Sequence, residues 1–260
     1  MNTVPQNGSF GVLKQKMEGF GDFILFGSRF FRQIFKRPFE WREWLFQCYK
    51  TGYQSMPLVS ITAFIMGIVL TLQSRPSLVQ FGAESLLPGM VSFSVIKEIG
   101  PVITAVICAG KISSRMGAEL GAMNVTEQIS AMEVSAINPY RFLVVTRVLA
   151  TTLMIPILVI YADGIALLAS YLAVNIHGQV SLTRFFDLAL SRLEFIDFVP
   201  AVIKSFLFGY AIGIIGCYKG FQANEGTSSV GTAANSAVVT ASLAIFFLDM
   251  LTVQITDLLT

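Results

Sequence analysis

Five apolar segments, each about as long as a membrane crossing, constrain this chain more than any other feature of its sequence. A helix needs about 20 mostly apolar residues to span the hydrocarbon core of a bilayer, where backbone polar groups can be hydrogen-bonded only within the protein. The segments are Met56–Ser74, Met90–Ala109, Phe142–Val174, Phe198–Tyr218 and Ala237–Leu259. They predict an all-α integral membrane protein with a five-span domain over residues 56–260. The third segment exceeds one straight crossing, which predicts a tilt, a kink at Pro156 or an extension beyond the bilayer.

The composition fits a helical membrane bundle. Hydrophobic residues make up 54% of the 260 residues and charged residues 13%, with a mean hydropathy of +0.67, whereas soluble domains carry about 25% charged residues. Small residues let helix backbones approach closely in a membrane. Gly209, Gly213, Gly216 and Gly220 recur at helical spacing and predict a packing face. The formal net charge of +2 is too small to indicate a nucleic-acid partner.

Residues 1–55 precede the first apolar segment and mix aromatic with basic side chains. The stretch FGDFILFGSRFFRQIFKRPFEWREWLFQCYK predicts an amphipathic helix lying in the membrane interface, with Trp41 and Trp44 at headgroup depth. A sixth span is disfavoured by four basic residues in this stretch: Arg29, Arg32, Lys36 and Arg37. We therefore assign residues 1–55 to an interfacial region on the cytoplasmic side.

The distribution of Lys and Arg predicts the orientation of the chain. Residues 1–50 carry eight of these residues, the 110–147 region four and the 219–236 loop one. The opposite ends of the spans carry three: Arg75, Arg184 and Arg192. Because basic loops are retained in the cytoplasm, we expect a cytoplasmic N-terminus and a C-terminus on the outer side.

Residues 110–141 form a charged segment between the second and third spans, on the side predicted to be cytoplasmic. Apolar residues recur there in steps of three and four and predict one helical stripe: Ala118, Ala122, Val125, Ile129, Met132 and Ala136. Asn138–Pro139 should end this helix, because the residue before a proline is pushed out of the helical region. The pattern alone fits a helix resting on the membrane and a docking helix for a soluble partner equally well.

Lys97 and Glu98 interrupt the second apolar segment. A charged residue at the centre of a spanning helix costs about 2.5 to 3.5 kcal/mol and usually faces a cavity or a partner. The alternative is that both residues lie near the outer end of the span and reach water. Pro101 follows three residues later and should loosen the helical hydrogen bonding at this point.

The other polar residues offer little for catalysis. Asp163 and Asp249 lie in apolar segments, but neither has the Gly-x-Gly-Asp pattern of an aspartyl intramembrane protease. His177 is the only histidine, so a metal site or a Ser–His pair has little to build on. No Gly-x4-Gly-Lys-[Ser/Thr] motif occurs, so the chain is not expected to hydrolyse ATP. The sequence predicts no enzyme, no cofactor and no metal.

The stretch KEIGPVITAVICAGKISSRMGAELGAMNVTEQISAMEVSAINPYR, residues 97–141, resembles the signature region of the MlaE (YrbE) family. These proteins are permease subunits of ABC-type phospholipid transporters that work with MCE-domain proteins. The similarity covers the patterns E-[IL]-G-P, A-G-[RK], A-E-[IL]-G-x-M-x-x-T-E-Q and M-E, together with the length and span layout. The chain departs from the family at Lys111, where Arg is usual, and at Asn138, where Asp is usual.

The resemblance implies a multi-pass permease of the bacterial inner membrane, with its C-terminus in the periplasm. It implies a homodimer that carries phospholipid, a separate cytoplasmic ABC ATPase, a periplasmic MCE-domain protein and a role in outer-membrane lipid asymmetry. It leaves room for a small cytoplasmic accessory subunit. On the residues alone, two alternatives remain: an ion-coupled secondary carrier, although no internal repeat is evident, and an intramembrane enzyme.

Two groups of candidate site residues follow from the resemblance. The ATPase-coupling residues belong to the charged segment: Glu119, Gly121, Met123, Thr126, Glu127 and Gln128. The substrate-binding residues combine apolar surface for acyl chains with charges for a headgroup: Leu70, Leu78, Phe81, Lys97 and Glu98.

Overall fold

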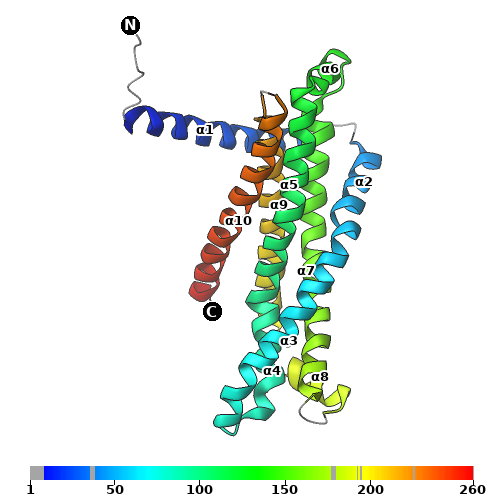
Figure 1. Cartoon of the computed structure of the whole chain (residues 1–260), viewed down its shortest axis with the longest axis vertical. Coiled ribbons are helices and arrows are strands. Elements are labelled where there is room, and N and C mark those ends of the chain that lie inside the picture. The colour runs from blue at the N-terminus through cyan, green and yellow to red at the C-terminus, as the bar shows by residue number, and fades with distance from the viewer. Residues whose placement is uncertain are drawn as a thin grey trace.

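The computed structural model describes residues 9–35, 39–176, 180–191, 193, 195–224 and 226–259 as an elongated helical bundle (Figure 1). Lys36, Arg37, His177 and Arg192, considered above, lie outside the described residues. Five rods within the described chain are long and apolar enough to cross a membrane: Trp41–Gln80, Glu84–Val125, Tyr140–Asn175, Phe198–Phe221 and Gly226–Leu258. The five predicted spans and the all-α fold class are therefore confirmed.

The N-terminal helix α1 (Ser9–Ile34) lies across the long helices near one end of the bundle (Figure 1). The first rod then begins with α2 (Trp41–Thr51) and continues through the 3-10 turn Tyr53–Ser55 into α3 (Met56–Gln80). The sequence placed residues 41–55 in the interfacial region, whereas the structure makes them the start of the first rod. The reason is tertiary, because Gln47, Cys48 and Thr51 are buried on a face of α2 that packs against α7.

The second rod contains an irregular turn beside the predicted intramembrane charges. After a 3-10 turn (Glu84–Leu86), α4 (Leu87–Ser94) leads into a π-helical turn, η3 (Val95–Ile99), and then into α5 (Gly100–Val125). Pro101 has no N–H to donate back into the preceding turn, and the helix adapts by widening just before it. The predicted loosening is confirmed, and the helical rod continues through the turn without a break.

The predicted single helix through residues 118–136 is wrong. The helix α5 ends at Val125, and the shorter α6 (Gln128–Val134) begins after a break in which Glu127 has a φ of 58°. The Nδ2 of Asn124 donates to the carbonyl oxygens of Phe221 (3.1 Å) and Ala223 (2.9 Å). This contact ties the end of α5 to the end of α9 and stops the helix where the apolar stripe would have continued. α6 itself ends four residues before Asn138, and Ala136 has a φ of 59°.

The remaining helices complete the bundle. A π-helical turn, η4 (Tyr140–Val145), leads into α7 (Thr146–Asn175), which passes through Pro156 without interruption. The rod is 36 residues long and thus about 54 Å, well beyond the roughly 30 Å hydrocarbon core. The chain ends with α8 (Leu182–Leu190), α9 (Phe195–Phe221) and α10 (Gly226–Leu259).

Helices α5, α7 and α9 pack on one another at the centre, while α3 lies on α7 and α10 lies on α5 and α9 (Figure 1). The predicted glycine face of α9 packs closely against two neighbouring helices. A Cβ at Gly213 would meet Val148 of α7, and one at Gly216 would meet Ser113 of α5. The outer helices are less covered by the rest of the chain. In the apolar 18-residue stretch of each rod, 17% of the residues of α10 are buried, against 67% for the rod that contains α7.

The contact between α3 and α7 gives a test of this packing. A Cβ at Gly67 would overlap the backbone carbonyl of Ala166, which cannot move aside, whereas a Cβ at Gly110 would meet nothing within 4 Å. We expect Gly67→Ala to lower the free energy of unfolding by about 1 to 3 kcal/mol and Gly110→Ala to leave it unchanged or raise it slightly. Thermal unfolding in detergent measures both, and equal midpoints for the two variants would contradict the close α3–α7 contact.

Candidate functional site

A buried lysine joins three helices in the membrane-spanning part of the bundle. Lys204 of α9 has a side chain that is only 4% exposed, and its Nζ donates to Oε2 of Glu98 (2.7 Å) and to Oδ1 of Asp249 (3.1 Å). Glu98 belongs to the π-helical turn η3 and Asp249 to α10. An unpaired ammonium group inside a bilayer would be strongly unfavourable. The two carboxylates therefore make the burial of Lys204 possible.

The cluster is open on one side. The Glu98 side chain is 41% exposed, and a small cavity of about 50 Å³ borders it. Its lining comes from η3, α9 and α10: Lys97, Glu98, Pro200, Lys204, Thr252, Val253, Thr256 and Asp257. This volume suits one or two water molecules rather than a lipid headgroup. The cluster is called the polar wall below; within one chain, its cavity is too small to hold a lipid headgroup.

The π-helical turn positions these charges. A π turn inserts an extra residue into a helix and is frequent at functional sites. Lys97 lies over the Phe93 ring at 4.8 Å from its centroid, and Glu98 reaches Lys204. Asp163 of α7 also lies close to this turn. A Cβ added at Gly100, the residue after η3, would overlap the Asp163 carboxylate. The sequence treated Asp163 and Asp249 as separate carboxylates, and the structure brings both near this region.

The predicted substrate-binding residues are divided between two sides of the chain. Leu78 is buried in the core, Leu70 is half-buried against it, and Phe81 is 82% exposed just after α3. These residues belong to the α3 side, which packs on α7, while Glu98 faces α9 and α10. One chain therefore does not bring the predicted acyl surface and headgroup charges together.

The sequence analysis missed Lys204. Its signal was available, because a single lysine in the apolar stretch VPAVIKSFLFGY needs an anionic partner inside a membrane. Two such partners, Glu98 and Asp249, had been singled out already. What the sequence could not show is that these three residues meet.

The C-terminal part of α5 and the break after it carry the predicted coupling residues, and Glu119 among them is paired within the chain. Its carboxylate pairs with Lys50 of α2 (3.1 Å), Arg147 of α7 (3.4 Å) and Arg115 of α5 (3.9 Å). The same junction includes hydrogen bonds from Arg115 to the carbonyl of Lys50 (2.9 Å) and from Lys111 to that of Gln54. Glu119 thus fastens α2 and α7 to α5.

The other coupling residues differ in exposure. Gly121 packs against α10 and the segment before it, since a Cβ there would lie 3.2 Å from the Cβ of Ala223. Met123 is half-buried. Thr126, Glu127 and Gln128 are exposed at the break between α5 and α6. This exposed set, residues 126–128, is called the tip below.

The two departures from the family pattern have simple environments. Lys111 donates to the backbone carbonyl of Gln54, a contact that needs a single donor and no planar fork. Asn138 accepts a hydrogen bond from the backbone N–H of Arg141 through its Oδ1 (3.1 Å), as an Asp carboxylate could. Both contacts are of a kind that the usual family residue could also make.

Five helices long and apolar enough to span a membrane, with a buried charged cluster between them and an exposed tip at one end, define a multi-pass α-helical membrane protein. The family profile described as Permease MlaE matches residues 44–255. The chain belongs to the MlaE permease family, whose members are ABC transporter permeases. Family membership decides against the secondary carrier and the intramembrane enzyme.

Relatives from bacteria and plants support this assignment. A probable ABC transporter permease protein of Rickettsia typhi is 34% identical over 92% of this chain and 91% of its own length. One of Synechocystis is 37% identical over 79% of this chain and 78% of its own length. The chloroplastic protein TRIGALACTOSYLDIACYLGLYCEROL 1 of Arabidopsis thaliana is 31% identical over 84% of this chain and 62% of its own length.

The buried lysine gives a second test. Lys204→Met leaves Glu98 and Asp249 facing each other without their cation, so we expect the free energy of unfolding to fall by about 3 kcal/mol. Adding Asp249→Asn should restore part of that loss, because it removes one of the two uncompensated charges. The exposed pair Arg75–Glu84, at 2.8 Å, is the control: Arg75→Gln should cost less than about 1 kcal/mol. Thermal unfolding in detergent checks the series, and a double variant less stable than Lys204→Met would contradict the pairing.

Proposed function

We propose that this chain is the membrane subunit of an ATP-driven phospholipid transporter in a bacterial inner membrane. It would exchange lipid with a periplasmic MCE-domain partner, in a system that maintains outer-membrane lipid asymmetry. The observation that carries the proposal is the continuity of α5. This single helix has the exposed tip at one end and the charged π-helical turn at the other.

The length and anchoring of α5 support a role as a lever. Its 26 residues extend about 39 Å, with Glu119 binding α2 and α7 to its inner part. An ATPase that moved the tip would move α5 together with these neighbours. The displacement would reach η3, where the hydrogen bonding changes from α-helical to π-helical and where Glu98 is paired with Lys204.

The polar wall and the α3 surface support a phospholipid as the substrate. Such a lipid presents charges at one end and acyl chains at the other, matching Lys97 and Glu98 on one side and Leu70, Leu78 and Phe81 on the other. The name of the Arabidopsis relative also contains the name of a glycerolipid. We extend that lipid connection to this chain as a proposal.

A homodimer would bring the two halves of the substrate site together. The outer helices are poorly covered within one chain. In their apolar 18-residue stretches, 17% of the residues of α10 and 28% of those of the first rod are buried. Both expose apolar side chains, including Leu243 and Phe247 on α10 and Ile61 and Ile65 on α3. A second copy whose α3 packed against α10 would place the α3 surface of one chain near the polar wall of the other.

The orientation follows from the basic residues, with the tip and the N-terminus in the cytoplasm and the C-terminus in the periplasm. Three of the basic residues counted above, Lys50, Arg115 and Arg147, meet around Glu119 at the end of the bundle that carries the tip. A cytoplasmic tip is also where an ATPase could reach it, so the next experiment tests this orientation together with the coupling role.

Reversing the charge at the tip should uncouple the transporter. Glu127→Lys replaces an exposed side chain without changing the demand for a left-handed backbone, so folding and insertion should be preserved. We expect lipid-stimulated ATP hydrolysis and lipid transport by the reconstituted complex to fall roughly tenfold, because a like charge would face the docking surface. Asp187→Lys, an exposed reversal on α8 far from the tip, should leave both unchanged. Normal coupling in Glu127→Lys would remove the tip from the mechanism.

Substitutions on the two sides of the substrate site should have different effects. Leu70→Trp should exclude acyl chains by volume, so most of the co-purified phospholipid should be lost. Lys97→Ala should leave the apolar surface open, so lipid should be retained with altered headgroup selection or slower transport. Mass spectrometry of bound lipid per dimer provides the measurement.

The matched control is Leu172→Trp, which adds the same volume at an exposed position on α7 and should keep the wild-type lipid content. Wild-type amounts and classes of lipid in both Leu70→Trp and Lys97→Ala would show that this surface does not bind the substrate.

A further inference from the structure

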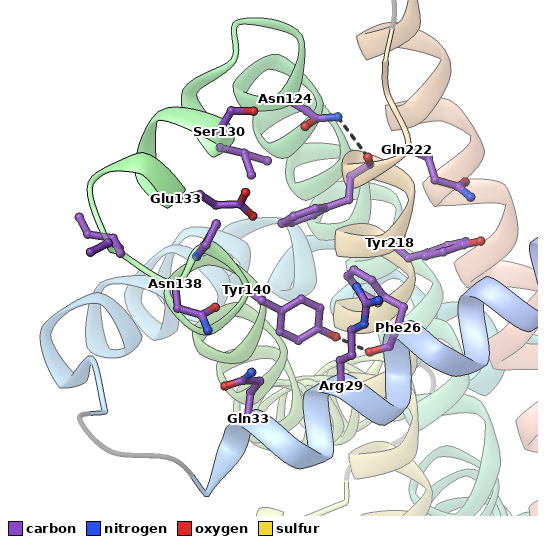
Figure 2. A pocket seen from close by; sticks show the side chains of 15 residues that line it. Phe26, Arg29, Gln33, Asn124, Ser130, Glu133, Asn138, Tyr140, Tyr218 and Gln222 are labelled. Atoms are coloured by element: carbon purple, nitrogen blue, oxygen red, sulfur yellow. Dashed lines mark hydrogen bonds between the residues drawn. The ribbon is translucent and has the colours of Figure 1, made fainter.

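A second and larger cavity lies at the end of the bundle that carries α6. Its volume is about 740 Å³, and it is an open cavity lined by α1, the end of α5, α6, η4 and the end of α9 (Figure 2). It lies apart from the polar wall around Lys204, because none of its lining residues belongs to η3 or α10. Cavities of this size are typical of small-molecule sites.

Aromatic rings form one wall of this cavity and are held in place by hydrogen bonds. The Tyr140 hydroxyl donates to the carbonyl of Phe26, and the Tyr218 hydroxyl donates to that of Gly19 (2.9 Å). The Phe26 ring lies edge-on to Tyr140 and Tyr218, with centroids 4.9 and 5.5 Å apart. Since their hydroxyls are occupied, the tyrosines present mainly ring surface to a ligand, and the wall is preformed.

Two opposite charges project into the same space. Figure 2 shows Arg29 extending from α1 and Glu133 from α6 on different sides of the cavity. The amide side chains of Gln33 and Asn138 lie at its lower edge (Figure 2). Lys219 already lies over Tyr218, 5.8 Å from the ring centroid, which leaves Tyr140 as the tyrosine available to a ligand cation.

This combination matches a ligand that carries both a phosphate and an ammonium group. A guanidinium binds phosphate oxygens through paired N–H donors. An ammonium group is favoured over an aromatic face and beside a carboxylate. A ligand with only one of these charges would leave Arg29 or Glu133 without its counterpart.

The position of α1 favours a lipid as the source of these groups. Its side chains Ile24, Phe31 and Phe35 lie on one helix face and are exposed, as expected of a helix whose apolar side enters the hydrocarbon. Gln33 lies on the opposite face and Arg29 next to it, one turn apart. The cavity is therefore at headgroup depth in the leaflet that holds α1.

We propose that this cavity binds the phosphoethanolamine headgroup of a phospholipid, with its phosphate on Arg29 and its ammonium between Glu133 and the aromatic wall. This lipid would be distinct from the transported one and would fasten α6 to α1. The position of the adjoining tip would then depend on the headgroups of that leaflet. The site does not rest on the proposed transport function.

Native mass spectrometry of the purified chain in detergent, with dioleoyl phosphatidylethanolamine or dioleoyl phosphatidylglycerol added, tests the site. Arg29→Gln should weaken binding of both lipids roughly tenfold, because both carry the phosphate. Glu133→Gln should weaken binding of the ethanolamine lipid alone, because the glycerol headgroup has no ammonium. Arg32→Gln, on the exposed surface of α1 and outside the cavity lining, is the matched control and should bind both lipids as wild type does.

Three results would overturn the proposal. In the first, Arg29→Gln and Glu133→Gln bind the ethanolamine lipid as well as Arg32→Gln does. In the second, free phosphoethanolamine displaces the lipid at equal concentration, which would assign the cavity to a soluble ligand. In the third, the variants reduce co-purification of an ATPase with lipid binding intact, which would make the cavity a protein-docking site. Leu70→Trp should not affect binding of lipid in this cavity. The binding measurement therefore tests the cavity even if the transport proposal fails.

Discussion

The pairing of Lys204 with Glu98 and Asp249 is the interaction on which the arrangement of the membrane part depends. A buried ammonium group in a bilayer requires anionic partners, and here they come from two other helices. Since residues on a helix are about 100° apart, the extra residue of η3 changes the direction in which Glu98 points. The widened turn before Pro101 is thus part of the same constraint. It lets one rod present a carboxylate to α9 without interrupting the crossing.

The helix α5 connects this constraint to the inner end of the bundle. Its middle packs on α9 and α10, and its inner part is bound to α2 and α7 through Glu119. The first half of the charged segment, residues 110–125, is therefore the continuation of a predicted membrane span. Only the tip and α6 project beyond it. A partner that pushes on the tip would act on a helix already joined to four neighbours, which is a direct physical route from the tip to the charges around Lys204.

The surfaces left open by this packing differ in chemistry. Helices α3 and α10 expose mostly apolar side chains on opposite sides of the central helices. The cavity between α1 and α6 instead combines aromatic rings with one basic and one acidic residue. The first kind of surface suits acyl chains or another apolar helix, and the second suits a charged headgroup.

The number of spans, the amphipathic helix and the family signature could all be read from the sequence, because hydrophobic length, charge spacing and a gapless motif are local properties of the chain. The loosened turn before Pro101 was predictable for the same reason. The pairing of Lys204 was not, because its partners Glu98 and Asp249 lie 106 and 45 residues away. Nor was the end of α5, which Asn124 sets by binding the end of α9, or the inward use of Glu119, whose cations come from three helices. The separation of Leu70 from Glu98 and the cavity below α6 likewise depend on which helices become neighbours. Side-chain pairing in a low-dielectric interior is decided by position in space, and only the packed tertiary structure supplies it.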